Sequence, residues 1–419
     1  MQLTMDWNIK MLGEIAEVKS GGTPLKANDK YWFGDIPWYT SGELNETYTR
    51  ASKSFITQQG LEKSNAKLFQ KGSLLIGMYD TGALKMSILD RDAAFNQAIA
   101  GVQPNENINL KFILYAIDYR KLEILNQRRG VRQKNLSLLK IQSIRLPIPP
   151  LLEQKRIVAI LDETFEGIDR AIANTEKNFA NSRELFESYR NSILIQENRL
   201  WEETTLGAEI DLMTGFPFKS NKYTDSAQSI RLLRGDNIVQ GALRWDDVKK
   251  WRESEINEYL IYQLKEGDVV LAMDRPWVKA GLKHAMISSD DLPCLLVQRT
   301  ACLRGKKNIN NRFLMYLIGS HSFIQHILSN QTGIGVPHIS GRQIQSFKFL
   351  KPSLSKQNFI IDNLDELRSK SQRLETIYRQ KIAALNELKQ SILQKAFTGE
   401  LTADTANQVK KTAQRVNAA

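Results

Sequence analysis

The most regular pattern of apolar and polar positions lies between Glu153 and Gln196, a stretch with no proline and one glycine. Apolar side chains recur there every seven residues, at Val158, Phe165, Ile172, Phe179, Phe186 and Ile193, with Leu161, Ile168 and Tyr189 at positions offset by three. A seven-residue apolar repeat is typical of a helix that buries one stripe against a partner helix. The stretch is therefore predicted to be a long coiled-coil helix.

A second segment, after Pro352, repeats this pattern less strictly. One register position holds Leu364, Tyr378, Leu385 and Ile392, the other holds Leu367, Leu374 and Leu388, and Ser371, Lys381 and Lys395 are polar exceptions. A helix of about 44 residues is about 65 Å long, far more than a compact domain needs to cover its own core. We expect the two helices to pair as an antiparallel coiled coil and to act as a spacer. The alternative is that each helix lies on its own domain.

The rest of the chain mixes short β-like runs, such as 73–78 and 268–273, with helical runs such as 112–122 and 313–318. Short strands at irregular spacing indicate an α+β fold rather than βαβ repeats. The predicted organisation is a mixed domain at 1–150, a helix at 151–198, a second mixed domain at 199–352 and a second helix at 353–401. Residues 402–419 lack apolar periodicity and are expected to be disordered.

The two halves of the chain resemble each other in order. Residues 36–44 match 230–238 at an offset of 194, 107–117 match 308–318 at 201, and 161–163 match 364–366 at 203. Offsets that grow slowly along the chain are those of a tandem duplication with loop insertions, so the predicted fold is a pseudo-twofold internal repeat.

Composition narrows the class of protein. The chain has 419 residues, 42% hydrophobic and 25% charged, which is the profile of a globular protein with real cores. Its two cysteines suit a reducing compartment, and neither a secretory signal nor an apolar run long enough to span a membrane is present, so a cytoplasmic location is expected. The net charge of +12 favours a polyanionic partner, most often nucleic acid.

Candidate catalytic chemistry is sparse. The sequence has no Gly-x-x-x-x-Gly-Lys-Ser/Thr phosphate loop and no Asp/Asn-Pro-Pro-aromatic turn of an adenine methyltransferase. The Glu-x-Lys triplets at 17–19 and 153–155 fit a nuclease tripeptide but are common by chance. All four histidines lie in the second half, so a mechanism shared by both repeats cannot use one. We expect no catalytic residue, no metal and no cofactor bound by this chain.

Both halves instead carry glycine-punctuated loops with basic, amide and aromatic side chains. Arg and Lys can neutralise phosphates or contact guanine, and Asn and Gln suit adenine edges. Any one of these loops taken alone is better explained as a solvated turn. Four cations between 128 and 134, however, repel one another unless a polyanion is near. The predicted DNA-binding residues are Thr40, Ser41, Tyr79, Lys85, Arg128, Arg129, Arg132, Lys134, Arg234, Asn237, Arg275, Trp277, Lys279, Lys283, His338 and Arg342.

Several segments resemble the DNA specificity (S) subunits of type I restriction-modification systems. Leu12-Gly-Glu-Ile15 and Ser20-Gly-Gly-Thr-Pro24 are similar to the opening of that family's target recognition domain. Residues 146–162, Leu-Pro-Ile-Pro-Pro followed by a helix, resemble its central conserved helix, and 388–401 its C-terminal signature. The second proline-to-helix segment, 351–358, departs from the pattern. The resemblance covers essentially the whole chain before the tail.

The resemblance implies a non-catalytic subunit. Two target recognition domains would read the two halves of a bipartite, asymmetric DNA site, and the paired helices would set the spacer. Two methyltransferase subunits would use S-adenosylmethionine to methylate adenine N6, and motor-nuclease subunits would use ATP and magnesium. A self-sufficient nuclease or methyltransferase with a divergent site, and a coiled-coil scaffold without DNA binding, remain as alternatives. Activity of the purified chain alone would distinguish the first alternative, and absence of DNA affinity the second.

Overall fold

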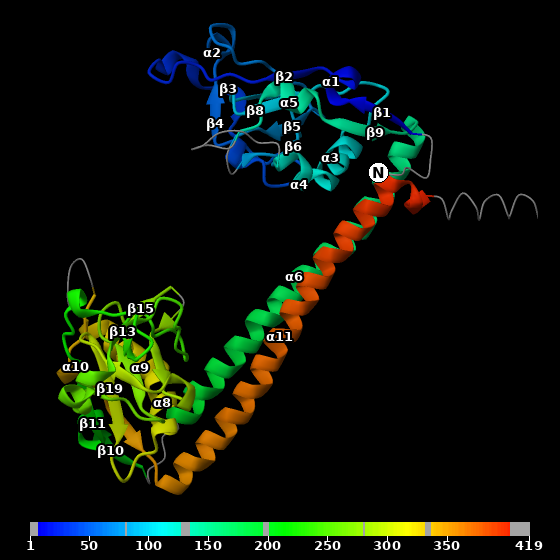
Figure 1. The fold of residues 1–419 in the computed structure, drawn as a ribbon. Helices are drawn as coiled ribbons and strands as arrows, with labels where there is room; N and C mark the ends of the chain where they lie inside the picture. The colour runs from blue at the N-terminus through cyan, green and yellow to red at the C-terminus, as the bar shows by residue number, and fades with distance from the viewer. Residues whose placement is uncertain are drawn as a thin grey trace, which may run out of the picture. The chain divides into compact units, whose positions relative to one another are not determined.

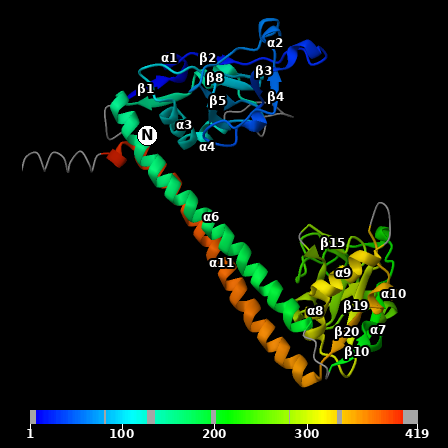
Figure 2. The same cartoon turned by 180° about the vertical axis from the view of Figure 1, so that it is seen from behind.

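The computed structural model describes residues 7–79, 82–126, 135–195, 201–279, 281–331 and 337–402. The chain divides into two compact units, Met1–Thr175 with Gln380–Ala419, and Glu176–Arg379. Each unit contains one mixed domain and one part of each of two long helices, α6 (Leu151–Ile195) and α11 (Leu354–Thr398), which lie side by side in Figures 1 and 2. The α+β class and the two tandem domains expected from the sequence are confirmed.

The first unit is built on an antiparallel sheet of four strands in the order β2-β8-β5-β6: β2 (Val18–Ser20), β8 (Ile99–Val102), β5 (Leu74–Gly77) and β6 (Met86–Ile88). A second sheet has the order β4-β3-β7: β4 (Ser54–Ile56), β3 (Trp32–Tyr39) and β7 (Ala94–Phe95), with β7 parallel to β3. A third pair joins β1 (Asn8–Met11) to β9 (Arg145–Ile148). The short helices are α1 (Leu12–Ile15), α2 (Gln58–Glu62), α3 (Leu110–Tyr119), α4 (Lys121–Leu125) and α5 (Leu138–Gln142).

The second unit repeats these sheets. Its four-stranded sheet has the order β11-β19-β14-β17: β11 (Ile210–Thr214), β19 (Thr300–Gly305), β14 (Val269–Ala272) and β17 (His284–Met286). Its mixed sheet has the order β13-β12-β18: β13 (Lys249–Arg252), β12 (Ser229–Leu233) and β18 (Cys294–Leu296), with β18 parallel to β12. The remaining strands are β10 (Glu202–Thr205) paired with β20 (Lys348–Lys351), and the hairpin β15 (Trp277–Val278) with β16 (Gly281–Leu282). The helices are α7 (Leu206–Glu209), α8 (Asn311–Gly319), α9 (His321–Asn330) and α10 (Gly341–Gln345).

The two mixed domains have the same order of strands in their sheets, as expected for a duplicated domain. Strands β5 and β14 occupy equivalent places and are buried on both faces. Successive side chains of each strand point to opposite sides of the sheet and enter different clusters. Leu74 and Ile76 of β5 pack with the helices, while Leu75 joins a separate cluster with Tyr39 and Phe95. Strand β14 divides in the same way between the second unit's two larger clusters.

In each unit, an aspartate of the long helix forms hydrogen bonds to a helix of the mixed domain that precedes it. Asp162 of α6 accepts from the Tyr115 hydroxyl at 2.6 Å and from Lys111 Nζ at 2.7 Å, both on α3. In the second unit Asp365 of α11 accepts from Tyr316 and from Arg312 Nε on α8. Burial and the neighbouring carboxylate raise the pKa of both tyrosines, that of Tyr316 to about 12. Each tyrosine therefore stays a neutral donor at ordinary pH.

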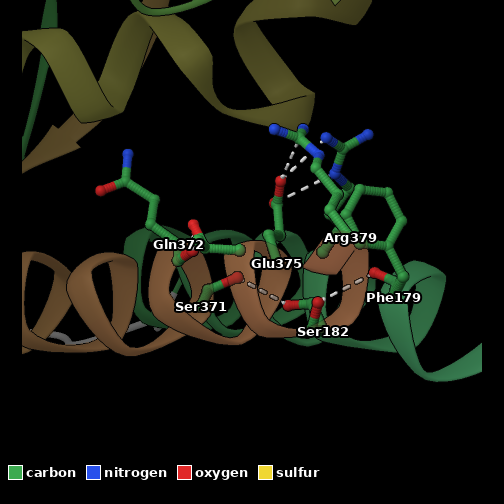
Figure 3. Close-up of polar contacts among 8 residues, drawn as sticks. Phe179, Ser182, Ser371, Gln372, Glu375 and Arg379 are labelled. Carbon is green, nitrogen blue, oxygen red and sulfur yellow. Dashed lines mark hydrogen bonds and ion pairs between the residues drawn. The ribbon is translucent and has the colours of Figure 1, made fainter. Parts of the chain in front are cut away.

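Within the second unit the two helices run antiparallel. From Phe179 to Arg183 along α6, the partner positions on α11 run backward from Arg379 to Glu375. In Figure 3, Glu375 lies beside Arg379, and Ser371 faces Ser182 across the helix pair. Since Ser371 Oγ donates to the Ser182 carbonyl at 3.0 Å and both residues are 8% exposed, small polar side chains stand at this point of the seam.

Candidate nucleic-acid interface

A lysine occupies the same structural position in both mixed domains. Lys85 directly precedes β6, and its carbonyl accepts from the Gly77 amide at 2.8 Å. Lys283 directly precedes β17, and its carbonyl accepts from the Ala272 amide at 3.0 Å. The equivalent hairpins thus hold one lysine each at the end of the central strand. Lys85 and Lys283 both belong to the predicted DNA-binding residues. The fold shows that they occupy equivalent positions in the two repeats.

In the first domain, Lys85 lies beside the loop that carries Thr40 and Ser41. Its Nζ donates to Asn45 Oδ1 at 3.0 Å. A Cβ added to Gly82 would lie 3.0 Å from Ser41 Oγ, so the segments around 41 and 82 are in close contact. The amide and the hydroxyl of Thr40 both donate to Glu43 Oε2 at 2.8 Å, so the polar groups of Thr40 cap the short helix that follows it. Tyr79, on the same loop as Gly82, is 39% exposed.

In the second domain, Lys283 lies among other charges. Burial lowers its pKa, Asp236 opposes this shift, and Arg275 and Arg244 reinforce it. Arg234 is paired with Asp236 at 3.2 Å. Arg234, Arg244, Arg275 and Lys283 thus gather positive charge at these loops, and such a group of cations is suited to binding the phosphates of a DNA backbone. Arg244 was not among the residues expected from the sequence, because it lies outside the glycine-punctuated loops.

Asp274 organises a second group of predicted residues. It accepts from Arg299 Nη1 at 2.8 Å and contacts His338 Nδ1 at 2.6 Å. The neighbouring Arg275 has a left-handed backbone, with φ of 43°, and its amide donates to the Pro337 carbonyl at 2.7 Å. The 274–283 segment and the 337–342 segment are therefore tied together. Arg299, with φ of 65°, is a further participant that sequence reasoning missed.

The remaining predicted residues differ in accessibility. Trp277, Lys279 and Arg342 are exposed, Trp277 to 40%. Asn237 is only 4% exposed, and both ends of its side-chain amide are bonded within the loop: Oδ1 accepts from the Arg234 amide and Nδ2 donates to the Arg244 carbonyl, both at 3.0 Å. In this structure Asn237 therefore shapes the loop rather than offering its side chain to a ligand. Arg128, Arg129, Arg132 and Lys134 lie outside the described residues.

The predicted helix-pairing residues are buried to different extents. Val158, Phe165, Ile193 and Leu364 are buried, and Ile172, Phe179, Phe186, Leu367, Leu385 and Ile392 are half-buried. Leu374 and Leu388 differ from the expectation, since they are 40% and 46% exposed. Leu367, at the same register position, is half-buried, so the exposure at this position varies along α11.

Within the described ranges, no three His, Cys, Asp or Glu side chains are grouped as metal ligands. No helix among these residues combines the length and apolar character needed to cross a bilayer.

The duplicated mixed domain, with an equivalent lysine at the end of its central strand in each copy, defines a protein built of two similar domains and a pair of long helices. A family model described as type I restriction modification DNA specificity domain matches residues 4–178 and 184–384. The chain therefore belongs to this family of DNA specificity domains.

Individual relatives agree with this assignment. The chain is 38% identical over 180 residues, 43% of its length, to the type I restriction enzyme EcoAI specificity subunit of Escherichia coli, of which the match covers 30%. It is 22% identical over 421 residues to the MjaVIII specificity subunit of Methanocaldococcus jannaschii, covering 97% of this chain and 96% of that protein.

Solved structures show the same fold. A chain from a study of complex assembly and conformational transition of the type I R-M system matches with a TM-score of 0.79 and 17% identity, covering 96% of this chain and all of that one. The HsdS subunit from Thermoanaerobacter tengcongensis matches with a TM-score of 0.56 and 17% identity, covering 96% of this chain and 99% of that one.

Proposed function

We propose that this chain is the non-catalytic specificity subunit of a type I restriction-modification complex. The single observation that carries the proposal is the family match over both repeats, residues 4–178 and 184–384. Each mixed domain would read one half of a bipartite, asymmetric DNA site, and the helix pair would set the spacer. The equivalent positions of Lys85 and Lys283 support the same binding task in both domains.

The partners follow from this assignment. Double-stranded DNA is the ligand, two methyltransferase subunits would carry S-adenosylmethionine, and motor-nuclease subunits would carry ATP and magnesium. The target adenine would be flipped into a methyltransferase pocket, because a base inside the stack is out of reach of the enzyme. Such work on DNA would be cytoplasmic.

The proposed division of the chain is two target recognition domains, 1–150 and 199–352, with conserved helices at 151–198 and 353–401. A deletion of one heptad from both helices is expected to change the spacer of the recognised site and to leave both half-sites unchanged. Mapping methylated adenines genome-wide checks this. An unaltered spacer would reject the role of the helices, whereas loss of all methylation with a folded protein would reject the function.

The basic segment beyond the described residues gives a second test. Replacing Arg128 and Arg132 together with Ala is expected to weaken DNA binding and to reduce its dependence on salt, because two fewer phosphate contacts release fewer counterions. Binding measured at several salt concentrations reports both quantities. Binding that is unchanged throughout would exclude these residues from the interface.

The alternatives raised by the sequence make opposite predictions. A self-sufficient nuclease or methyltransferase would act on DNA when the purified chain is given magnesium or S-adenosylmethionine, and a pure scaffold would not bind DNA. We expect the purified chain to bind DNA and to leave it chemically unchanged.

A further inference from the structure

The second unit contains a crevice between its mixed domain and the two long helices, with a volume of about 660 Å³. Arg190 of α6 and Arg368 of α11 line it from the helices, and Gln240, His284 and Gly319 line it from the domain. Trp277, Gly281 and Leu282 of the 274–283 segment also line it, so the crevice adjoins the loops described above. Arg190 and Arg368 come from the long helices, outside those loops, and they make the crevice a further candidate for binding.

Arg190 is a buried cation with an unused donor. The residue is 8% exposed, and its Nε has no hydrogen-bond partner in the part of the chain that the structure describes. Its Nη2 contacts the carboxylate of Glu187, which is itself half exposed. A buried guanidinium has five N–H groups to satisfy, and an unsatisfied buried donor is costly. An acceptor inside the crevice would remove this penalty.

Arg368 adds a second guanidinium of the same sign. Across the described ranges, no carboxylate lies within 4.0 Å of it, whereas Arg183 nearby is bound bidentately by Glu375 at 3.0 and 2.9 Å. Burial lowers the pKa of Arg190, and the charge of Arg368 acts in the same direction. Among the described residues, Glu187 is the one carboxylate paired with either of these two arginines, which leaves an excess of positive charge beside Arg368.

The floor of the crevice is kept open and uncharged. A Cβ on Gly319 would lie 3.0 Å from Arg190 Nη1 and 3.1 Å from His284 Nε2, so glycine leaves room for both side chains. His284 Nδ1 is 3.1 Å from the Leu282 carbonyl, which assigns the proton to Nδ1 and leaves Nε2 as an acceptor. Burial, with the charges of Arg190 and Arg368, lowers the pKa of His284 to about 4. The ring is therefore neutral at pH 7.

The first unit shows that the fold does not need these arginines. Its equivalent crevice, of about 850 Å³, is lined by Leu393 and Phe165, the positions 203 residues from Arg190 and Arg368 in the aligned helices. Leu393 is 1% exposed and Phe165 8%. Met86 stands where His284 stands in the second unit. The first crevice is also lined by charged residues, among them the ion pair of Lys389 with Asp169 at 2.7 Å. At the two positions of Arg190 and Arg368, however, the first unit packs with apolar side chains, so the fold does not require an arginine at either one.

We propose that the crevice of the second unit binds a phosphate group held between Arg190 and Arg368. Guanidinium groups bind phosphate oxygens through paired N–H donors, and the carboxylates of Glu187 and Glu375 already occupy other donors of Arg190 and Arg183. The volume exceeds that of phosphate alone, and Trp277, which is 40% exposed, lines the same crevice and can stack on a base. The phosphate is thus one carried by a nucleotide, either free or within DNA.

The experiment is isothermal titration of the purified full chain with inorganic phosphate, against sodium chloride of equal ionic strength. The decisive variant is Arg190→Leu with Arg368→Phe, which copies Leu393 and Phe165 of the first unit at these two positions and should fold. Wild type is expected to bind phosphate saturably, and the variant at least tenfold more weakly. The exposed arginines Arg170 and Arg373, changed together to Ala, lose the same charge and should bind as wild type does.

Two results overturn the proposal: no saturable binding by wild type, or equal binding by the double variant. Circular dichroism and the thermal midpoint verify folding, and Arg368→Gln, a change at a half-buried side chain, gives an independent variant with the same expected loss. Competition separates the sources of the phosphate. A DNA duplex that displaces inorganic phosphate indicates backbone phosphate, and tighter binding of AMP without displacement by the duplex indicates a free nucleotide. Because inorganic phosphate is the first probe, failure of DNA recognition by the loops would leave this result unaffected.

Discussion

Gln154 and Gln357 make the same three hydrogen bonds at the starts of the two long helices. Gln154 Oε1 accepts from the Asn109 amide at 2.9 Å, and its Nε2 donates to the carbonyls of Asn107 and Pro149 at 3.4 and 2.9 Å. Gln357 Oε1 accepts from Asn310 at 2.8 Å, and its Nε2 donates to Asn308 and Pro352 at 3.0 and 2.9 Å. The second junction departs from the first in sequence but keeps this glutamine.

Replacing Gln357 with Ala is expected to destabilise the second unit by about 2 to 4 kcal/mol, because the residue is fully buried and its loss leaves one amide and two carbonyls without partners. Urea unfolding of the purified chain measures the change. Gln394→Ala, on the exposed side of α11, is the control and should change stability by less than about 0.5 kcal/mol. Equal effects of the two substitutions would contradict the role given to Gln357.

Lys85→Ala and Lys283→Ala are each expected to weaken DNA binding and to lower the slope of log binding constant against log salt by about 1, the loss of one phosphate contact. Fluorescence anisotropy with a DNA duplex at several salt concentrations measures both. Lys177→Ala, at an exposed position of α6, serves as the control. A slope that stays the same in both lysine variants would remove the equivalent lysines from the proposed DNA interface.

The Arg183–Glu375 pair is expected to stabilise the helix pair only modestly. Its geometry is bidentate, but the Arg183 side chain is 52% exposed, so solvent screens the attraction and a double-mutant cycle should give a coupling of about 0.5 to 1 kcal/mol. Exchanging the two charges, as Arg183→Glu with Glu375→Arg, should recover part of the loss seen in either single variant. A coupling energy of zero in the cycle would show that the ion pair does not stabilise the packing of the two helices.

His284 should make the stability of the second unit depend on mildly acidic pH. Its folded-state pKa of about 4 lies below the usual value of 6.5, so the unfolded chain takes up a proton first as pH falls. The stabilisation is present above about pH 6.5 and is lost progressively toward pH 4, by about 2 to 3 kcal/mol. Urea midpoints of wild type and His284→Met, which copies Met86, are compared across this range. Parallel profiles would show that His284 does not contribute.

The sequence predicted the architecture well because its signals are periodic and duplicated. The apolar heptads fixed two long helices, and the ordered matches at slowly growing offsets predicted two equivalent domains. Burial was harder to predict at Leu374 and Leu388, since both keep the seven-residue spacing of Leu367, which is half-buried.

The candidate site was predicted less completely, for physical reasons. Asn237 has a side chain suited to reading a base, but its own loop uses both ends of the amide. Arg244 and Arg299 join the basic groups only through folding, which brings separate loops together. The crevice lined by Arg190 and Arg368 could not be predicted from the sequence, because these residues lie on different helices and come together only in the folded chain.

The core of the first unit depends on Phe397, which is fully buried against Phe112 at a ring distance of 5.3 Å and against Tyr119 at 5.6 Å. Phe397 lies 285 residues after Phe112 and 278 residues after Tyr119 in the chain. During translation, the domain made first must wait with an unfilled apolar gap until the second domain and nearly all of the last helix have left the ribosome. The first domain can therefore complete this part of its core only after the second half of the chain has been made.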